Sequence, residues 1–342
     1  MNIILVPVIS IILFPLTVMT LIFPILDNIL YLITNILENI SLYASSIEIT
    51  KLILPKPSIL FILFYYLFVI IIIKKKRYLH ILILLLIFHY LSPSLNFNME
   101  ITMFDVGQAD SMLITYPHGK INILIDTGRI DYTMINGIIP YLKSKGIRKI
   151  DYLIITHGDE DHIGGAITLI KNFKVDNIIL NRGEYSESEV ELINNANNIN
   201  IINNVKKIKT NNKYLYFLNE KIYENENNNS IIIYFEHLKH KFLFMGDSTF
   251  VAEDYLIENY NLKNISVLKV GHHGSSTSTT KTFIGTIKPK ISLISVGKNN
   301  YGHPSKEVLN NLQSSIIYRT DNNGTIICKI FKNKIKLTTY AN

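Results

Sequence analysis

The sequence contains a single cysteine, Cys328, among its 342 residues. One thiol cannot close a disulfide within the chain, and it cannot build a cysteine-based zinc site. Any metal that the protein binds must therefore be held by histidine and carboxylate side chains.

Charge is scarce in residues 1–97, which carry six basic and three acidic side chains. The other 28 basic and 24 acidic residues leave residues 98–342 with a net charge of only +4. So small an excess is weak evidence for a nucleic-acid partner, and on charge alone a solvated surface rich in Lys and Asn explains it better.

Apolar runs in the poorly charged part predict about three transmembrane helices, near residues 3–26, 55–73 and 78–95. A bilayer core is spanned by about 20 apolar residues. The first run lacks the preceding basic residues and the small-residue cleavage site of a signal peptide. Between the first two runs, Ile and Leu recur at helical spacing over residues 28–42. This pattern predicts an amphipathic helix in the membrane interface, or one packed against other membrane segments.

The basic turn Lys74–Arg77 separates the second and third apolar runs by only four residues. The two runs therefore predict a tight helical hairpin. By the positive-inside rule this turn lies in the cytoplasm, so the third helix runs outward. We expect a multi-pass protein of the plasma membrane with residues 98–342 on its outer face.

From Met99 onward the pattern changes to short apolar runs that end at Gly or Asp, which indicate buried strands. These runs lie at residues 101–107, 111–116, 121–128, 151–158, 175–180, 230–235, 241–247, 265–274, 291–297, 315–320 and 324–330. Helical stretches are predicted at residues 133–145, 164–172, 250–259 and 305–313. Together they indicate a layered α/β domain. Residues 185–229 are rich in Asn and Glu with little pattern, and we expect them to form a variable surface stretch.

The strongest chemical signal is the segment THGDEDHIGG at residues 156–165. It places four potential metal ligands, His157, Asp159, Asp161 and His162, within six residues. On a tight loop before a helix, His157 and Asp159 can face one cation while the other pair faces a second. Imidazole and carboxylate suit Zn²⁺, Mn²⁺ or Fe. A polar loop with incidental histidines is the alternative, but the preceding strand and the following Gly-Gly argue against it.

This segment resembles the HxHxDH motif of the metallo-β-lactamase superfamily, and the resemblance covers most of residues 99–330. It implies an αββα sandwich that binds two divalent metal ions, Zn²⁺ or Mn²⁺. In this chain about three predicted transmembrane helices precede the sandwich. The chain departs from the motif at Asp159, where the family has histidine. A carboxylate in place of an imidazole shifts the preference from Zn²⁺ toward harder ions such as Mn²⁺.

The same resemblance implies roles for two further aspartates, each at the end of a predicted strand. Asp126 matches an aspartate that orients the metal-binding loop from behind its ligands, although a simple turn aspartate is the alternative. Asp247 matches a bridging carboxylate, which offers one oxygen to each of two cations about 3.5–4 Å apart.

The histidines of GHHGS and YGHPS are the remaining candidates. One of His272 and His273 is expected to bind a metal and the other to contact substrate or a carboxylate. The sequence does not decide between them, and we favour His272 as the ligand. His303 resembles the last histidine of the family, where it would complete the second metal site or bind the scissile phosphate. A histidine before proline is more often structural, so His303 ranks below the others.

The motif DVGQ-x-DS at residues 105–111, together with HGDEDHIGG, GHHGS and YGHPS, resembles the C-terminal domain of ComEC-type competence proteins. Those are inner-membrane channels of bacterial DNA uptake. The resemblance implies DNA as a partner, alongside other channel components, and we expect Asp110 and Ser275 to contact the substrate. Three spans are far fewer than a full channel needs. The chain is either a truncated or divergent member, or a short membrane-anchored hydrolase that uses the same domain.

The reaction predicted for such a site is metal-assisted hydrolysis, in which two cations lower the pKa of a water molecule. Asp161 would hold that water and shuttle its proton. His303, or the histidine of the pair that does not bind a metal (His273, if His272 is the ligand), would stabilise charge on the phosphate.

Three functions are compatible with this chemistry. The leading hypothesis is a nuclease or phosphodiesterase of DNA uptake that acts at the outer face of the membrane. One alternative is a membrane-anchored hydrolase of another phosphodiester or ester. The other is a non-catalytic DNA-binding component of a channel, against which the complete set of ligands argues.

Overall fold

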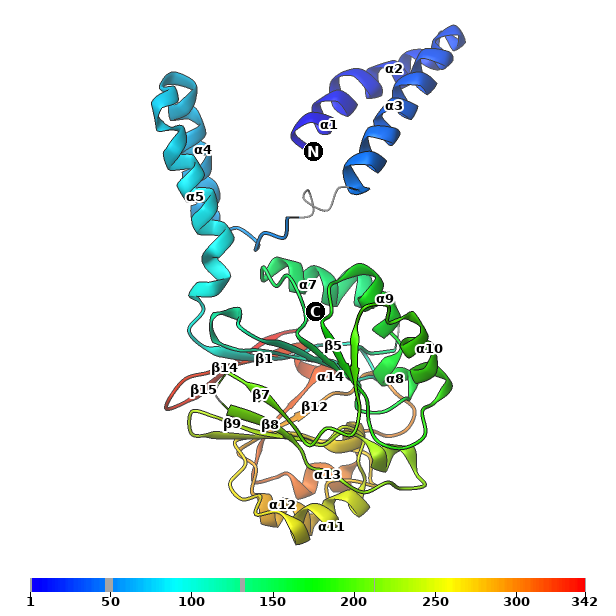
Figure 1. Ribbon diagram of the computed structural model, residues 1–342, viewed down its shortest axis with the longest axis vertical. Coiled ribbons are helices and arrows are strands. Elements are labelled where there is room, and N and C mark those ends of the chain that lie inside the picture. Colours follow the sequence, from blue (N-terminus) through cyan, green and yellow to red (C-terminus); the bar gives the residue numbers. More distant parts are fainter. Residues whose placement is uncertain (1, 47–51, 130–132, 212, 342) are drawn as a thin grey trace. The chain divides into compact units, whose positions relative to one another are not determined.

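The computed structural model describes residues 2–46, 52–129, 133–211 and 213–341. By its internal contacts the chain divides into two compact units, Met1–Ile53 and Leu54–Asn342 (Figure 1).

The first unit is helical. It contains α1 (Asn2–Val8), a π-helical turn (Ile9–Leu13), α2 (Phe14–Thr20) and the long helix α3 (Asp27–Ser46). The helical run is shorter than the span predicted at 3–26, because Phe23 leaves helical geometry (φ −124°, ψ 85°) in front of Pro24. A residue before proline is pushed out of the α region by the proline ring.

The second unit begins with a helical hairpin formed by α4 (Ile59–Lys74) and α5 (Leu79–Leu91). The rings of Phe61 and His89 stack with centroids 4.1 Å apart, so the start of α4 lies beside the end of α5. Among the described helices, only Lys76–Leu95 has both the length and the apolar composition to cross a membrane. Leu5–Thr20 and Ile59–Lys74 are shorter apolar helices. Three spans and their orientation therefore stay predictions.

Two mixed β-sheets form the centre of the second unit. The first has the strand order β15-β14-β1-β2-β3-β4-β5-β6 and the second the order β13-β12-β11-β10-β9-β8-β7. The strands of the first sheet are β1 (Met99–Met103), β2 (Met112–Thr115), β3 (Asn122–Ile125), β4 (Tyr152–Ile154), β5 (Asn177–Ile179), β6 (Asn200–Ile202), β14 (Thr325–Ile330) and β15 (Ile335–Tyr340). Those of the second are β7 (Lys207–Thr210), β8 (Lys213–Phe217), β9 (Ile233–His237), β10 (His240–Phe244), β11 (Val267–Lys269), β12 (Ile291–Ile294) and β13 (Ile316–Arg319).

The sheets pack on each other through one apolar core. Side chains alternate across a strand, so every second residue reaches this core. Ile101 and Ile154 come from the first sheet, and Phe235 and Phe242 from the second, where their rings stack at 4.7 Å.

Helices cover the outer faces of both sheets (Figure 1). On the side of the first sheet these are α7 (Ile139–Ser144), α8 (Glu160–Ile163), α9 (Ala166–Asn172) and α10 (Glu187–Asn195). On the side of the second they are α11 (Phe250–Asn259), α12 (Lys281–Ile287) and α13 (Lys306–Asn311). The four layers form an αββα sandwich, which confirms the predicted fold class of the domain.

All eleven predicted apolar runs contain a strand, and the four predicted helical stretches contain helices. Residues 185–229, whose sequence shows little pattern, hold α10 and strands β6 to β8. In β7 and β8 Lys207, Lys209, Tyr214 and Tyr216 lie on the exposed face, and Ile208, Leu215 and Phe217 face the core. The polar residues on one face of such a short strand lower the average hydrophobicity of the segment. The alternation of apolar and polar residues that defines a strand is still present.

Candidate metal centre

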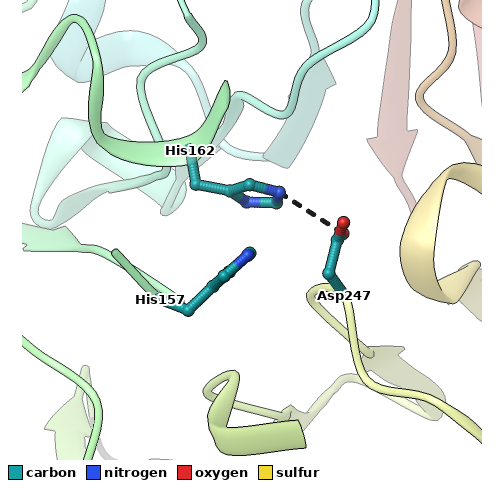
Figure 2. Close-up of side chains that lie close together, drawn as sticks. All are labelled: His157, His162 and Asp247. Atoms are coloured by element: carbon teal, nitrogen blue, oxygen red, sulfur yellow. Dashed lines mark ion pairs between the residues drawn. The ribbon is translucent and has the colours of Figure 1, made fainter. Parts of the chain in front are cut away.

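Loops from both sheets meet at one edge of the sandwich. His157 and His162 follow β4, and Asp247 follows β10 (Figure 2). Parallel strands end at the same edge of a sheet, and β10 is parallel to β11, which leads to His273. The fold therefore brings together residues more than 100 positions apart in the sequence.

One group of converging atoms comes from His157, His162 and Asp247. One ligand atom of each lies within 4.8 Å of the others, and His162 Nε2 is 3.4 Å from Asp247 Oδ1. His157 Nε2, His162 Nε2 and Asp247 Oδ1 are buried, and none has a hydrogen-bond partner in the described part of the chain. Burying a polar atom without a partner is costly. Two imidazole nitrogens and a carboxylate oxygen that face one another fit a divalent cation, which would satisfy all three.

A second group comes from Asp161, His162 and His273. His273 Nε2 lies 3.3 Å from Asp161 Oδ2 and 3.3 Å from Asp247 Oδ2. Asp247 thus directs Oδ1 to His162 and Oδ2 to His273, the arrangement that a carboxylate between two cations requires. The grouping differs from the expected one, in which Asp161 and His162 faced a cation apart from His157.

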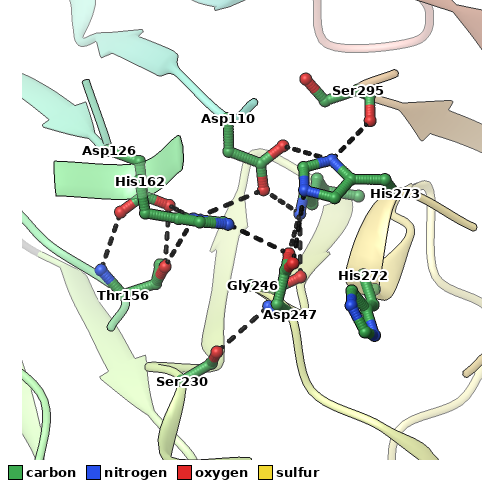
Figure 3. Close-up of polar contacts among 12 residues, drawn as sticks. Asp110, Asp126, Thr156, His162, Ser230, Gly246, Asp247, His272, His273 and Ser295 are labelled. Carbon is green, nitrogen blue, oxygen red and sulfur yellow. Dashed lines mark hydrogen bonds and ion pairs between the residues drawn. The ribbon is translucent and has the colours of Figure 1, made fainter. Parts of the chain in front are cut away.

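Asp126, for which the family resemblance implies a supporting role, lies behind His162 (Figure 3). It accepts hydrogen bonds from the backbone N–H and the hydroxyl of Thr156, both at 2.8 Å, and it lies 2.8 Å from His162 Nδ1. Its backbone is left-handed, with φ of 56°. The carboxylate occupies Nδ1 and so turns Nε2 of His162 toward Asp247.

The pair His272 and His273 is arranged opposite to our expectation. Both residues have left-handed backbone, with φ of 48° and 52°, in a turn that sends the two side chains in different directions. His273 is buried, and its Nδ1 lies 2.8 Å from the carbonyl of Ser295. His272 points away from this group (Figure 3), with Nδ1 3.2 Å from Thr277 Oγ1. The structure therefore brings His273, and not the favoured His272, to the candidate ligands.

Asp159 and His303 lie at the rim of the centre. The side chain of Asp159 is 47% exposed, and its Oδ2 is 3.3 Å from His157 Nε2. The neighbouring imidazole of His157 lowers the pKa of Asp159. His303 stands beside His272, with ring centroids 5.8 Å apart, and its Nδ1 is buried with no hydrogen-bond partner among the described residues.

Ser275 was expected to contact the substrate, but its hydroxyl is engaged in its own turn. The Ser275 oxygen accepts hydrogen bonds from the Thr277 backbone N–H at 3.3 Å and from the Thr277 hydroxyl at 3.0 Å.

Asp110 lies beneath the centre rather than on a substrate surface, and only 3% of it is exposed. It forms an ion pair with Lys269, a residue that the sequence analysis did not single out. Lys269 also donates a hydrogen bond to the Gly246 carbonyl at 2.8 Å, and its Nζ is 3.6 Å from Asp247 Oδ1. Burial by itself lowers the pKa of Lys269, but Asp110 and Asp247 raise it by more, so the ammonium stays charged. The sequence signal that could have identified Lys269 is its position as a charged residue within an apolar run that forms a buried strand.

The ionisable groups of the centre stabilise one another's charged forms. Burial opposes ionisation of Asp161, but the imidazoles of His273 and His162 together outweigh burial and lower its pKa to about 2. Burial likewise opposes protonation of His273, whereas Asp247 and Asp110 raise its pKa to about 10. A cation among these carboxylates would supply the positive charge in place of the proton, because a ligating imidazole is neutral.

Two residues of the stretch 185–229 contact the loops that carry the candidate ligands. Glu226 accepts a hydrogen bond from the Gly158 backbone N–H at 3.1 Å. Asn228 accepts from the backbone N–H and hydroxyl of Thr249, at 3.1 and 2.7 Å, just after Asp247. Nothing in the composition of this stretch marked these contacts, because they are made by a loop between strands of the second sheet.

Comparison with known proteins supports the chemistry of this geometry. Residues 104–298 match the family described as the metallo-beta-lactamase superfamily. The chain is 34% identical over 270 residues to the ComE operon protein 3 of Bacillus subtilis, an alignment that covers 72% of this chain and 35% of that protein. It is 29% identical over 249 residues to the recombination protein 2 of Haemophilus influenzae, covering 70% and 30%. Competence protein ComA of Neisseria gonorrhoeae is 29% identical over 232 residues, covering 66% and 31%. The chain thus spans about a third of the length of these relatives.

Solved structures were also compared with the chain. The metallo-beta-lactamase fold protein YhfI from Bacillus subtilis aligns at 10% identity with a TM-score of 0.44, covering 66% of this chain and 98% of that one. The metal-dependent hydrolase Tm1679 aligns at 14% identity with a TM-score of 0.44, over the same shares.

Proposed function

The chain belongs to the metallo-β-lactamase superfamily, as a ComEC-type competence protein with a metal-dependent hydrolase domain, and from this premise we propose that it cleaves phosphodiester bonds of DNA. One observation carries the proposal. Four buried nitrogen and oxygen atoms, from His157, His162, Asp247 and His273, point at one another without hydrogen-bond partners in the described residues.

These residues divide between two cation positions. His157, His162 and Asp247 would hold one divalent ion, with Asp159 beside them at the rim, and Asp161, His273 and Asp247 would hold the other. Such ions, when bound, would supply Lewis acidity and lower the pKa of a bound water molecule. The substitution of carboxylate for imidazole at Asp159 favours Mn²⁺ over Zn²⁺.

The protein's own groups orient the attacking water and the phosphate. Asp161 is partly exposed and ionised, because its pKa is lowered to about 2, so its carboxylate can accept a hydrogen bond from the attacking water and orient it. His303 and His272 stand together at the open side of the centre, where they can donate to phosphate oxygens.

We further propose that this chemistry takes place at the outer face of the plasma membrane during DNA uptake. The basic turn Lys74–Arg77 supports an inward hairpin loop and an outward domain. DNA as the substrate is supported by the relatives named for competence and recombination.

The test uses the full chain in phosphatidylcholine nanodiscs with plasmid and single-stranded DNA, in the presence of Mn²⁺ or Zn²⁺. We expect metal-dependent cleavage that EDTA abolishes. Asp161→Ala should lower the cleavage rate at least about 100-fold, the lower end for loss of a positioned acid–base group. The matched control is Asp254→Ala, which removes an exposed aspartate of α11.

The alternatives give different results. A protein that turns over other phosphodiesters or esters but leaves DNA intact would point to the second hydrolase function. A protein that binds DNA and takes up no transition metal would refute catalysis and leave the channel-component hypothesis.

A further inference from the structure

The hairpin of β7 and β8 carries a concentration of positive charge that the catalytic centre does not use. Residues 192–219 contain no Asp or Glu and four lysines, namely Lys206, Lys207, Lys209 and Lys213. Lys206 forms an ion pair with Glu220 at 2.8 Å.

The hairpin presents Tyr214 and Tyr216 on the same face as Lys207 and Lys209. Its apolar residues enter the core between the sheets, so these four side chains, which alternate with them, lie on the outer face. The register pairs Lys207 with Tyr216 and Lys209 with Tyr214. The ring centroids of Tyr214 and Tyr216 are 6.1 Å apart, and the Lys207 ammonium lies 4.5 Å from the Tyr214 ring. The tyrosines are 41% and 39% exposed, although helices cover much of this sheet.

The register of the second sheet also orients the hairpin toward the metal centre. Phe244, which precedes Asp247 by three residues, pairs with Ile233 of β9, and Ile233 pairs with Phe217 of β8. The end of β8 therefore lies at the edge of the sheet that holds the centre. From Tyr214 to Phe217 is about 10 Å of strand. The chain then continues to Glu226, which contacts the metal-binding loop at Gly158.

We propose that the outer face of the β7–β8 hairpin binds single-stranded DNA and leads it to the metal centre. The proposal rests on the proposed function, because it supplies the surface that such a substrate needs. Unpaired bases stack on exposed aromatic rings, and lysines beside the rings neutralise the phosphates. Duplex DNA keeps its bases stacked inside and cannot use the two rings, so the single strand is the form that fits.

A purely structural role makes a different prediction. Lys–Tyr pairs across a hairpin contribute a little to its stability by themselves. In that case their loss would lower the melting temperature and leave DNA binding unchanged.

The experiment measures the anisotropy of fluorescent oligo(dT) with the full chain in phosphatidylcholine nanodiscs and EDTA, so that binding is separated from cleavage. The double variant Tyr214→Ala/Tyr216→Ala should bind at least tenfold more weakly. Lys207→Gln/Lys209→Gln should reduce the slope of log K against log salt by about 1.4, at about 0.7 for each charge on a single strand. The matched control is Lys336→Gln/Tyr340→Ala on the edge strand β15, which also exposes a lysine and a tyrosine and should bind normally.

Folding is controlled by Tyr214→Phe/Tyr216→Phe, which keeps the rings and should bind within about twofold of the original chain. Equal binding by the Ala variant and the original chain would overturn the inference, as would loss of binding in the Phe variant with an unchanged melting temperature. A hairpin-dependent affinity for phosphatidylglycerol vesicles, without affinity for oligo(dT), would overturn it in favour of a lipid surface.

Hydrolysis of bis(p-nitrophenyl) phosphate with Mn²⁺ tells the two proposals apart. The Ala variant should retain this activity, since the small substrate does not reach the hairpin. An original chain with no hydrolytic activity but hairpin-dependent DNA binding would refute the proposed nuclease and support the DNA-binding face.

Discussion

The two sheets contribute to the metal centre in different ways. From the first sheet, His162 is held by hydrogen bonds, since Asp126 receives two from Thr156 and pairs with the imidazole at 2.8 Å. From the second sheet, Asp247 is surrounded by charge, with the Lys269 ammonium 3.6 Å away on one side and His273 3.3 Å away on the other. The residues of the first sheet fix the orientation of the His162 imidazole, and those of the second sheet compensate the charge of Asp247.

This difference leads to different consequences of mutation. Hydrogen bonds that orient a ligand can be weakened while the ligand itself stays in place, so excess metal should compensate. A charge removed from a buried cluster leaves its partner without compensation, and added metal cannot restore it unless the metal takes the same position.

The largest effect is expected for Asp247→Asn, which removes the only carboxylate in the described residues that belongs to both candidate ion positions. Cleavage should fall by more than about 100-fold, the upper end for residues that merely support a ligand. Elemental analysis of the purified chain should show loss of both ions. Retention of two ions by the variant would mean that Asp247 does not bridge the two candidate ion positions.

The next effect separates the adjacent histidines. His273→Ala should lose the ion of the second group, because His273 Nε2 lies 3.3 Å from both Asp161 and Asp247. His272→Ala should keep both ions and weaken turnover, since its ring contacts Thr277 and Asn227 instead. Metal stoichiometry and cleavage, measured in parallel, check both variants. The opposite pattern would restore the assignment favoured from sequence.

The contrast between the two sheets also explains which residues of the metal centre could be predicted from sequence. His157, His162 and Asp126 belong to short local segments, where a strand, a tight loop and a helix start follow one another. Such segments carry their geometry in their own residue order. A Gly-Asp pair at the end of a strand is a weak signal by itself, and Asp247 was identified by its place in the order of motifs of the resembled family.

The unpredicted contacts depend on distant packing. Lys269 looked like an interruption of an apolar strand until the fold placed Asp110 against it, 159 residues earlier in the chain. The orientation of His272 and His273 depends on two left-handed residues in succession, which have no sequence signal outside Gly and Asn. Strands β7 and β8 were missed because their charged face dominated the composition.

A smaller effect is expected for Asp126→Asn. The amide can still accept a hydrogen bond from Thr156, but it would offer an N–H where His162 Nδ1 now meets a carboxylate oxygen. Metal affinity and cleavage should fall by about 10 to 100-fold, and a higher Mn²⁺ concentration should recover part of the rate. Asp254→Asn, at an exposed position of α11, is the matched control. If saturating metal gave no recovery, Asp126 would be more than an orienting group.

The smallest effect on cleavage is expected for Lys269→Met, below about tenfold, because the ammonium supports Asp247 from 3.6 Å and does not occupy a ligand position. Its effect should appear in stability. Removal of one partner of a buried ion pair leaves the other charge unpaired, so the free energy of unfolding should fall by about 3–5 kcal/mol.

Adding Asp110→Asn should recover most of that loss, because the uncompensated carboxylate is then gone. Denaturant unfolding of the four proteins in EDTA measures the coupling, and losses that add within about 0.5 kcal/mol would show that the pair is not coupled. Strong coupling, with cleavage largely retained, would establish that the second sheet holds Asp247 by charge compensation, where the first holds His162 by hydrogen bonds.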